Sequence, residues 1–132
     1  MMEGHMKIKN FHDLNVWKQA HTLVLEIYGL TKNFPREELY SLSDQLKRAA
    51  VSITSNIAEG FGRRSYAEKI YFYSIAQGSL TELQNQLIVA RDVNYLSKDS
   101  YNKIDDLSVN VNKLLNGLLR KTRQLKTLNS SF

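Results

Sequence analysis

The stretch LSDQLKRAAVSITSNIAEGFG, residues Leu42 to Gly62, decides the fold of this chain. Apolar side chains recur along it at intervals of three and four residues, at Leu46, Ala50, Ile53 and Ile57. This spacing places them on one face of a helix, and the two glycines near the end of the stretch are typical of a helix terminus. The pattern therefore predicts an amphipathic helix that buries one side.

Polar side chains interrupt the apolar face in the last turns of this predicted helix. Ser52, Asn56 and Glu59 stand beside residues that should be buried, so they need hydrogen-bond partners from another segment. We expect polar and glycine residues of two predicted helices to form one structural motif that joins them. Its members are Ser52, Asn56, Glu59, Gly60, Gly78, Ser79 and Glu82.

The second half of this motif lies in a longer helical pattern further along the chain. Ser79, Glu82 and Gln86 follow one another beside an apolar seam. We expect them to face Asn56 and Glu59. A glycine inside a helix costs about 1 kcal/mol of stability relative to alanine, so Gly78 predicts close approach of another backbone.

Three further segments have the same amphipathic character as the central stretch. Asp13, Ser41 or Ser43, Ser65 and Ser97 are suitable N-caps for the four predicted helices, and Glu68 completes a capping box with Ser65. The further segments cover residues 13–33, 65–94 and 97–126.

Short links join the four predicted helices, so helices adjacent in sequence should run antiparallel. We predict an all-α fold, an antiparallel up-down-up-down four-helix bundle with long helices, formed by residues 11–127. Residues 1–10 are interpreted as a disordered or tag-derived N-terminus, because Gly4-His5-Met6 resembles a vector scar. Residues 128–132 are expected to be a frayed C-terminus.

Composition narrows the class of protein. A chain of 132 residues with one proline and 42% hydrophobic content fits a single globular domain. It contains no cysteine, which excludes disulfides and thiolate chemistry. No apolar run approaches the roughly 20 residues of a membrane span, and the N-terminus lacks the apolar region of a signal peptide. We expect a cytoplasmic protein without membrane contact.

Residues for catalysis are scarce. The sequence has no glycine-rich phosphate loop and lacks the Glu-x-x-His motif of metal sites in helical bundles. Glu59 and Glu82 could be imagined as an acid–base pair, but without a nucleophile or ligand beside them we favour structural roles. His21 is interpreted as a hydrogen-bonded histidine at the edge of the core. We expect no enzymatic activity, no cofactor and no metal.

The distribution of charge favours a polyanionic partner. The net charge is +5, and no acidic residue follows Asp106. No aromatic residues alternate with the cations, so nucleic-acid binding should depend on phosphates and be indifferent to base sequence. The sequence leaves open whether the basic clusters are neighbours. The candidate nucleic-acid contacts are Lys47, Arg48, Arg63, Arg64, Arg120, Lys121 and Arg123.

Several motifs, in order, resemble those of a known family. They include the run from Ser52 to Gly60, Phe34-Pro35, and Ile75 to Leu80 followed by Glu82-Leu83. The chain between residues 11 and 119 thus resembles the four-helix-bundle proteins encoded in 23S rRNA intervening sequences. Gln77 stands where the resemblance leads us to expect a basic residue.

The resemblance implies an antiparallel bundle that assembles into a ring of five chains, a homopentamer. It also implies kinship with the accessory protein of diversity-generating retroelements, which is associated with nucleic-acid and partner binding. For the intervening-sequence proteins themselves it implies no molecular activity. We therefore expect a non-enzymatic oligomeric protein that binds RNA or DNA through a basic surface. The alternative is a protein–protein scaffold or accessory subunit with no nucleic-acid contact.

Overall fold

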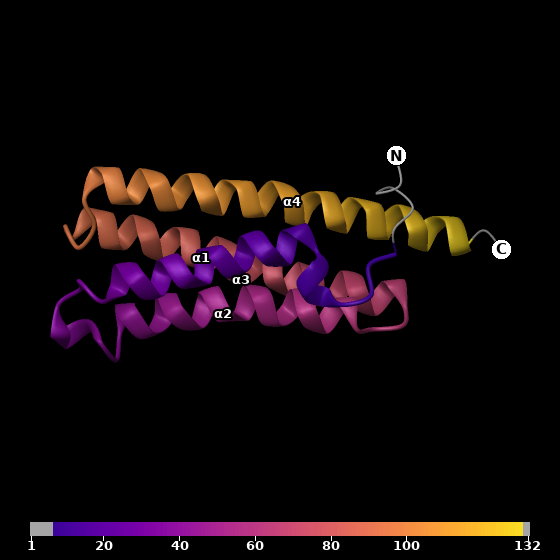
Figure 1. Cartoon of the computed structure of the whole chain (residues 1–132), viewed down its shortest axis with the longest axis horizontal. Coiled ribbons are helices and arrows are strands. Elements are labelled where there is room, and N and C mark those ends of the chain that lie inside the picture. Colours follow the sequence, from indigo (N-terminus) through magenta and orange to yellow (C-terminus); the bar gives the residue numbers. More distant parts are fainter. Residues whose placement is uncertain (1–6, 131–132) are drawn as a thin grey trace.

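Four long helices make up the computed structural model, which describes residues 7–130 (Figure 1). A short 3-10 turn, η2 (Phe11–Asp13), precedes the first helix, and a second, η3 (Arg36–Glu38), lies between the first two. Residues 1–10 were expected to be a disordered or tag-derived N-terminus, and the first six of them lie outside the described residues. The helices are α1 (Asn15–Thr31), α2 (Leu42–Phe61), α3 (Tyr66–Asp92) and α4 (Lys98–Ser130).

The helices pack in sequence order as a bundle. α2 lies against α1 and α3, and α4 lies against α3 and α1, so each helix has two neighbours (Figure 1). The predicted all-α fold with an up-down arrangement is confirmed. The core runs along the bundle axis and includes Leu23, Ile53, Leu80 and Leu115, each with no measurable solvent exposure. Burying such side chains contributes about 1.5–3 kcal/mol each.

Two of the four predicted N-caps are confirmed. The Ser65 hydroxyl accepts a hydrogen bond from the Glu68 backbone N–H at 3.1 Å, and Ser97 accepts one from the Ser100 N–H at 3.1 Å. Asp13 instead belongs to η2, and Leu14 occupies the N-cap position of α1.

Ser41, the expected cap of α2, makes no capping hydrogen bond because its hydroxyl donates to the Glu38 carboxylate. That same carboxylate also accepts from the Leu42 N–H, so a side chain from η3 takes over part of the cap.

The glycine that permits close packing is Gly60, not Gly78. A Cβ atom added at Gly60 would lie 2.6 Å from the Tyr73 ring and 3.1 Å from Cβ of Phe72. Tyr73 is itself buried. At Gly78 an added Cβ would meet nothing within 4 Å, so the predicted backbone approach there is absent within the described chain. The contact between α2 and α3 therefore depends on Gly60.

α4 is the longest helix and projects beyond the α2–α3 turn (Figure 1). It ends at Ser130, three residues beyond the expected boundary of the bundle. Leu119 and Thr122 are buried, whereas Leu125 and Leu128 are exposed to 37% and 62%. The apolar seam of α4 thus continues past the last residue that the other helices cover.

Candidate nucleic-acid interface

The polar motif between α2 and α3 is smaller than expected. The hydroxyl groups of Ser52 and Ser79 form a hydrogen bond of 2.7 Å across the two helices. The Asn56 amide donates to the Ser52 carbonyl at 2.8 Å and to its hydroxyl at 3.2 Å, both within α2. Ser52 is therefore the residue at which the polar groups of the two helices meet.

Glu59 and Glu82 do not take part in this contact. Both residues are exposed, and Glu82 accepts a hydrogen bond from the Gln86 amide of its own helix at 3.1 Å. Glu59 accepts from Arg63 at 2.9 Å, one turn further along the chain. The predicted pairing of Glu82 with Asn56 and Glu59 is not formed, because the side chains that point across the interface are the two serines.

Arg63 is held within the α2–α3 turn. In addition to Glu59, its guanidinium lies 3.6 Å from Glu68 and 4.6 Å from the centre of the Phe72 ring. Lys69 donates to the backbone carbonyls of Gly60 and Phe61, at 3.3 Å and 2.7 Å. Burial lowers the pKa of Lys69. These cations satisfy the end of α2 and are less available to a ligand.

Lys47 and Arg48 are also engaged by neighbours. The Lys47 ammonium lies 5.3 Å from the centre of the exposed Tyr28 ring, and Arg48 lies 3.8 Å from the Asp44 carboxylate. Both cations belong to a groove of about 430 Å³ between α1 and α2. A second groove of about 570 Å³ shares Ser55 with it and continues toward the α2–α3 turn.

Aromatic rings line the α1 side of this region, which the sequence pattern did not predict. Trp17 stacks on His21 with ring centres 4.7 Å apart, and Phe11 contacts Trp17 edge-on at 5.4 Å. His21 is exposed and has no hydrogen bond within the described chain, so its interpretation as a hydrogen-bonded core histidine is wrong. We call this surface the α1–α2 face. It comprises Phe11, Trp17, His21, Tyr28, Lys47 and Arg48.

A different arrangement is found where α3 and α4 lie side by side. The Gln77 amide donates to the Asn116 side-chain carbonyl, which fixes the relative position of the two helices. Arg120 and Arg123 follow Asn116 by four and seven residues and so share its side of α4. We call this surface the α3–α4 face. It comprises Gln77 of α3 with Asn116, Arg120 and Arg123 of α4.

Three neighbouring cations of α4 have no acidic partner among the described residues. Arg120, Lys121 and Arg123 are exposed, and none of them forms an ion pair with another described residue. No acidic residue occurs in α4 after Asp106, or in α3 between Glu68 and Glu82. A phosphate approaching here would meet cations without displacing a carboxylate.

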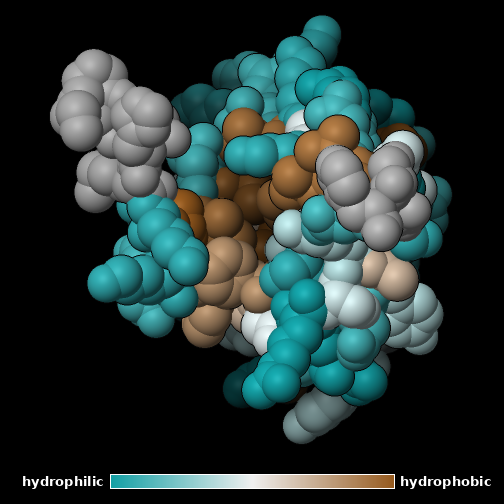
Figure 2. All heavy atoms as spheres, turned by 90° about the vertical axis from the view of Figure 1, so that its right-hand side faces the viewer, coloured by the Kyte–Doolittle hydropathy of each residue, from teal (hydrophilic) through white to brown (hydrophobic). Residues whose placement is uncertain are grey.

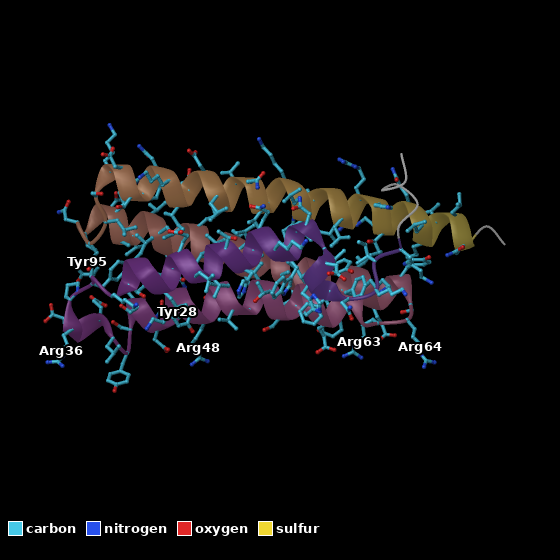
Figure 3. All side chains as sticks on the ribbon, viewed as in Figure 1. Tyr28, Arg36, Arg48, Arg63, Arg64 and Tyr95 are labelled. Atoms are coloured by element: carbon cyan, nitrogen blue, oxygen red, sulfur yellow. The ribbon has the colours of Figure 1, made fainter. Side chains whose placement is uncertain are left out.

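The α2–α3 turn and the last turns of α4 lie at the same end of the bundle (Figure 1). Arg63 and Arg64 are located at the turn, beside the end toward which α4 runs, whereas Arg48 lies further back along α2 (Figure 3). Figure 2 looks onto this end and shows apolar surface in a central hollow, surrounded by polar side chains.

At the opposite end of the bundle, the Glu38 carboxylate connects η3 to the link between α3 and α4. The Tyr95 hydroxyl, in the link between α3 and α4, donates to Glu38 at 2.8 Å. Hydrogen bonds from Ser41, Tyr95 and the Leu42 N–H lower the pKa of Glu38, and the bond to Glu38 raises the pKa of Tyr95. Sequence reasoning missed this contact because the two residues are 57 positions apart and no periodic pattern relates them.

Residues 7–130 contain no cluster of three or more His, Asp or Glu side chains that could hold a metal ion. Within the same range, no helix is long and apolar enough to cross a membrane.

Taken together, the fold and the charges define a four-helix protein whose last helix ends in a cluster of basic residues. The family model for the 23S rRNA-intervening sequence protein matches residues 12–117, and the chain belongs to this family. No curated protein matches the chain.

A solved structure from Bacteroides thetaiotaomicron is similar to this chain. It is described as a protein with unknown function from the S23 ribosomal protein family. The two are 26% identical with a TM-score of 0.74, and the match covers 80% of this chain and 95% of the other. The expected family and four-helix architecture are thus confirmed, while the relative's description assigns no activity.

Proposed function

We propose that this protein is a non-enzymatic, oligomeric binding protein that holds RNA or DNA through phosphate contacts on its α3–α4 face. The observation that carries this proposal is that two cations of this face, Arg120 and Arg123, and the adjacent Lys121 are exposed and have no ion-pair partners in residues 7–130. Neutralising phosphates with such cations releases counterions and gives binding that weakens steeply with salt.

The proposal favours those candidate cations that have no partner within the described residues. Lys47, Arg48 and Arg63 already contact Tyr28, Asp44 and Glu59 respectively, so a phosphate would have to compete with these partners. Arg64 is exposed at the same end of the bundle as the α4 cations. The proposal therefore assigns the main role to α4 and a secondary role to Arg64.

Assembly is part of the same proposal. Leu25 of α1 is 59% exposed, Tyr28 is 43% exposed, and Val51 of α2 is 39% exposed. Exposed apolar side chains on adjoining helices mark a surface that association would cover. We assign this surface to contacts between copies in a homopentamer, in keeping with the resemblance to ring-forming relatives. A ring would multiply the net charge of the chain fivefold and strengthen attraction to nucleic acid.

The resemblance of the sequence also implies kinship with the accessory protein of diversity-generating retroelements, and the association of that protein with nucleic-acid and partner binding supports the same proposal. The alternative is a protein–protein scaffold without nucleic-acid contact. The apolar hollow at the basic end favours this alternative, because exposed apolar surface contributes to protein association.

Two measurements test the proposal. Fluorescence titration of unrelated labelled RNA and DNA at two salt concentrations should show binding that is similar for all sequences and much weaker at high salt. Absence of binding at low salt would contradict it and favour the scaffold.

Light scattering after gel filtration should give five times the chain mass, and Leu25→Asp should reduce that mass. A monomeric wild type at micromolar concentration would contradict the assembly.

A further inference from the structure

We propose that a groove between α1, η3 and α2 binds an acidic peptide segment of a partner protein, through a carboxylate and a neighbouring apolar side chain. The groove lies at the end of the bundle opposite the last turns of α4, so the inference goes beyond the proposed function (Figure 1). Three observations carry it: a buried hydroxyl without a partner, cations in a wall without acids, and exposed apolar side chains beside them.

The groove has a volume of about 550 Å³, and we call it the η3 groove. Its apolar part consists of the buried Phe34 ring together with Pro35 and Leu39. Volumes between about 300 and 1,000 Å³ are typical of ligand sites in proteins. The η3 groove is therefore large enough to receive side chains of a bound segment.

A buried hydroxyl group opens into the η3 groove. Ser43, in the first turn of α2, is only 3% exposed and lines the groove. Its side chain forms no hydrogen bond with any residue between positions 7 and 130, and its oxygen is not fully enclosed by protein atoms. Buried polar groups nearly always have a partner, so this hydroxyl is suited to donate to an oxygen of a ligand.

The backbone of α2 provides further donors at the same place. Ser41 occupies the N-cap position without capping the helix, and Glu38 accepts only from the Leu42 N–H. The N–H groups of Ser43 and Asp44 have no acceptor among the described residues. Free N–H groups at the start of a helix carry partial positive charge, which favours an anion beside the Ser43 hydroxyl.

Three cations stand around this position. Lys47 follows Ser43 by one helical turn, Lys32 occupies the C-cap position of α1, and Arg36 belongs to η3 (Figure 3). Lys32 and Arg36 are exposed, and neither forms an ion pair within the described chain. None of the described residues that line the groove is acidic. A carboxylate inside the groove thus meets donors and cations only.

Acidic side chains nevertheless surround the groove outside its wall. Asp44 lies 3.8 Å from Arg48, and Glu38 accepts from the Tyr95 hydroxyl at 2.8 Å. The last turns of α4 differ, because no acid follows Asp106 there. A long polyanion meets repulsion on both sides of the η3 groove, whereas a short acidic segment does not. The charge distribution therefore favours a peptide carboxylate over a nucleic-acid backbone.

Exposed apolar side chains beside the cations favour a protein as the partner. Leu39 is 45% exposed, and the next residue, Tyr40, is 90% exposed. Tyrosine and arginine are enriched in protein interfaces, where an apolar centre is surrounded by polar groups. An acidic segment with an apolar side chain matches both parts of the site. Its carboxylate binds at Ser43 while its apolar side chain covers Leu39.

Fluorescence anisotropy of a labelled peptide tests this inference with the full chain. The probe is a short peptide that carries the run Glu-Glu-Leu-Leu-Glu-Glu. We expect it to bind saturably, and we expect roughly tenfold weaker binding when glutamine replaces glutamate or serine replaces leucine. Equal binding of the glutamine peptide, or no binding of the acidic peptide at low salt, would overturn the inference.

Ser43→Ala separates binding from stability. Alanine favours a helix more than serine does, and the hydroxyl that is lost has no partner, so the melting temperature should be unchanged or higher. Affinity for the acidic peptide should nevertheless fall about tenfold, because a hydrogen bond to a charged group is lost. Unchanged affinity of this variant would show that the peptide does not bind at the η3 groove.

A pair of arginine variants tests whether the charge must stand in the groove. Arg36→Gln should weaken peptide binding several-fold, whereas the matched control Arg48→Gln, one turn outside the groove wall, should not. Equal losses would mean that overall charge attracts the peptide. An oligonucleotide that displaces the peptide and binds Ser43→Ala less tightly would assign the groove to nucleic acid and overturn the inference. None of these outcomes decides whether nucleic acid binds on the α3–α4 face, which has its own titration.

Discussion

On the α1–α2 face each of the two cations has an intramolecular partner, whereas on the α3–α4 face Arg120 and Arg123 have none among the described residues. Both faces are built from long antiparallel helices, so the difference does not come from the fold. It comes from where the carboxylates stand, because Asp44 lies one turn from Arg48 while α4 has no acid after Asp106. A basic surface becomes available to a ligand only where its own acids are absent.

Removing the free cations should have the largest effect. In Arg120→Gln/Lys121→Gln/Arg123→Gln, three phosphate contacts are lost, and affinity for DNA should fall by roughly two orders of magnitude at low salt. Fluorescence anisotropy with a labelled oligonucleotide measures this. An affinity within a factor of two of wild type would show that the α3–α4 face is not the site.

A second pair of variants compares a packed glycine with a glycine that has open space around it. Gly60→Ala should destabilise the protein by about 1–3 kcal/mol, because its Cβ would overlap the buried Tyr73 ring. Gly78→Ala should instead stabilise it by up to about 1 kcal/mol through helix propensity. Chemical denaturation of both variants distinguishes them. A stabilising effect at both positions would contradict the packing described between α2 and α3.

Neutralising the cations of the α1–α2 face should have a small effect on binding. Lys47→Gln/Arg48→Gln removes two charges that already contact Tyr28 and Asp44, and we expect less than about a threefold loss of affinity. The same anisotropy titration applies. A loss as large as that of the triple α4 variant would mean that overall charge, and not its placement, controls binding.

The smallest effect concerns the end of the bundle that is far from the last turns of α4. Hydrogen bonds lower the pKa of Glu38 in the folded state, so its contribution to stability is present above the pKa of the unfolded chain and is lost as the pH falls through the folded value. Melting temperatures measured between pH 7 and acid should decrease less steeply for Glu38→Gln than for wild type. Identical pH profiles would show that Glu38 does not stabilise the link, and nucleic-acid binding should be unaffected.

Much of the fold could be predicted from the sequence. The spacing of residues such as Leu46 and Ile53 defines a helix face by itself, and the Ser65–Glu68 capping box marks a helix start within one turn. Such signals are local, so they do not depend on how the helices pack. The order of the helices then follows from their short links.

The candidate site was only partly predictable, because it depends on the rotation of each helix about its axis. The residue pattern alone could not show that Ser79 contacts Ser52 while Glu82 is exposed. It also could not show that the packed glycine is Gly60 and not Gly78. The partner of Arg63 across the turn, Glu68, likewise depends on the geometry of a link. The lack of ion pairs at Arg120, Lys121 and Arg123 among the described residues was predictable, because no acidic residue follows Asp106 in the sequence.

The most direct test of the central claim is arginine protection in the wild-type protein. Phenylglyoxal modifies exposed arginines, and mass spectrometry reports each position with and without bound nucleic acid. We expect nucleic acid to protect Arg120 and Arg123, while Arg48, whose side chain is 79% exposed, should react equally in both states. Protection of Arg48 together with unchanged modification of Arg120 and Arg123 would contradict the assignment of nucleic acid to the α3–α4 face.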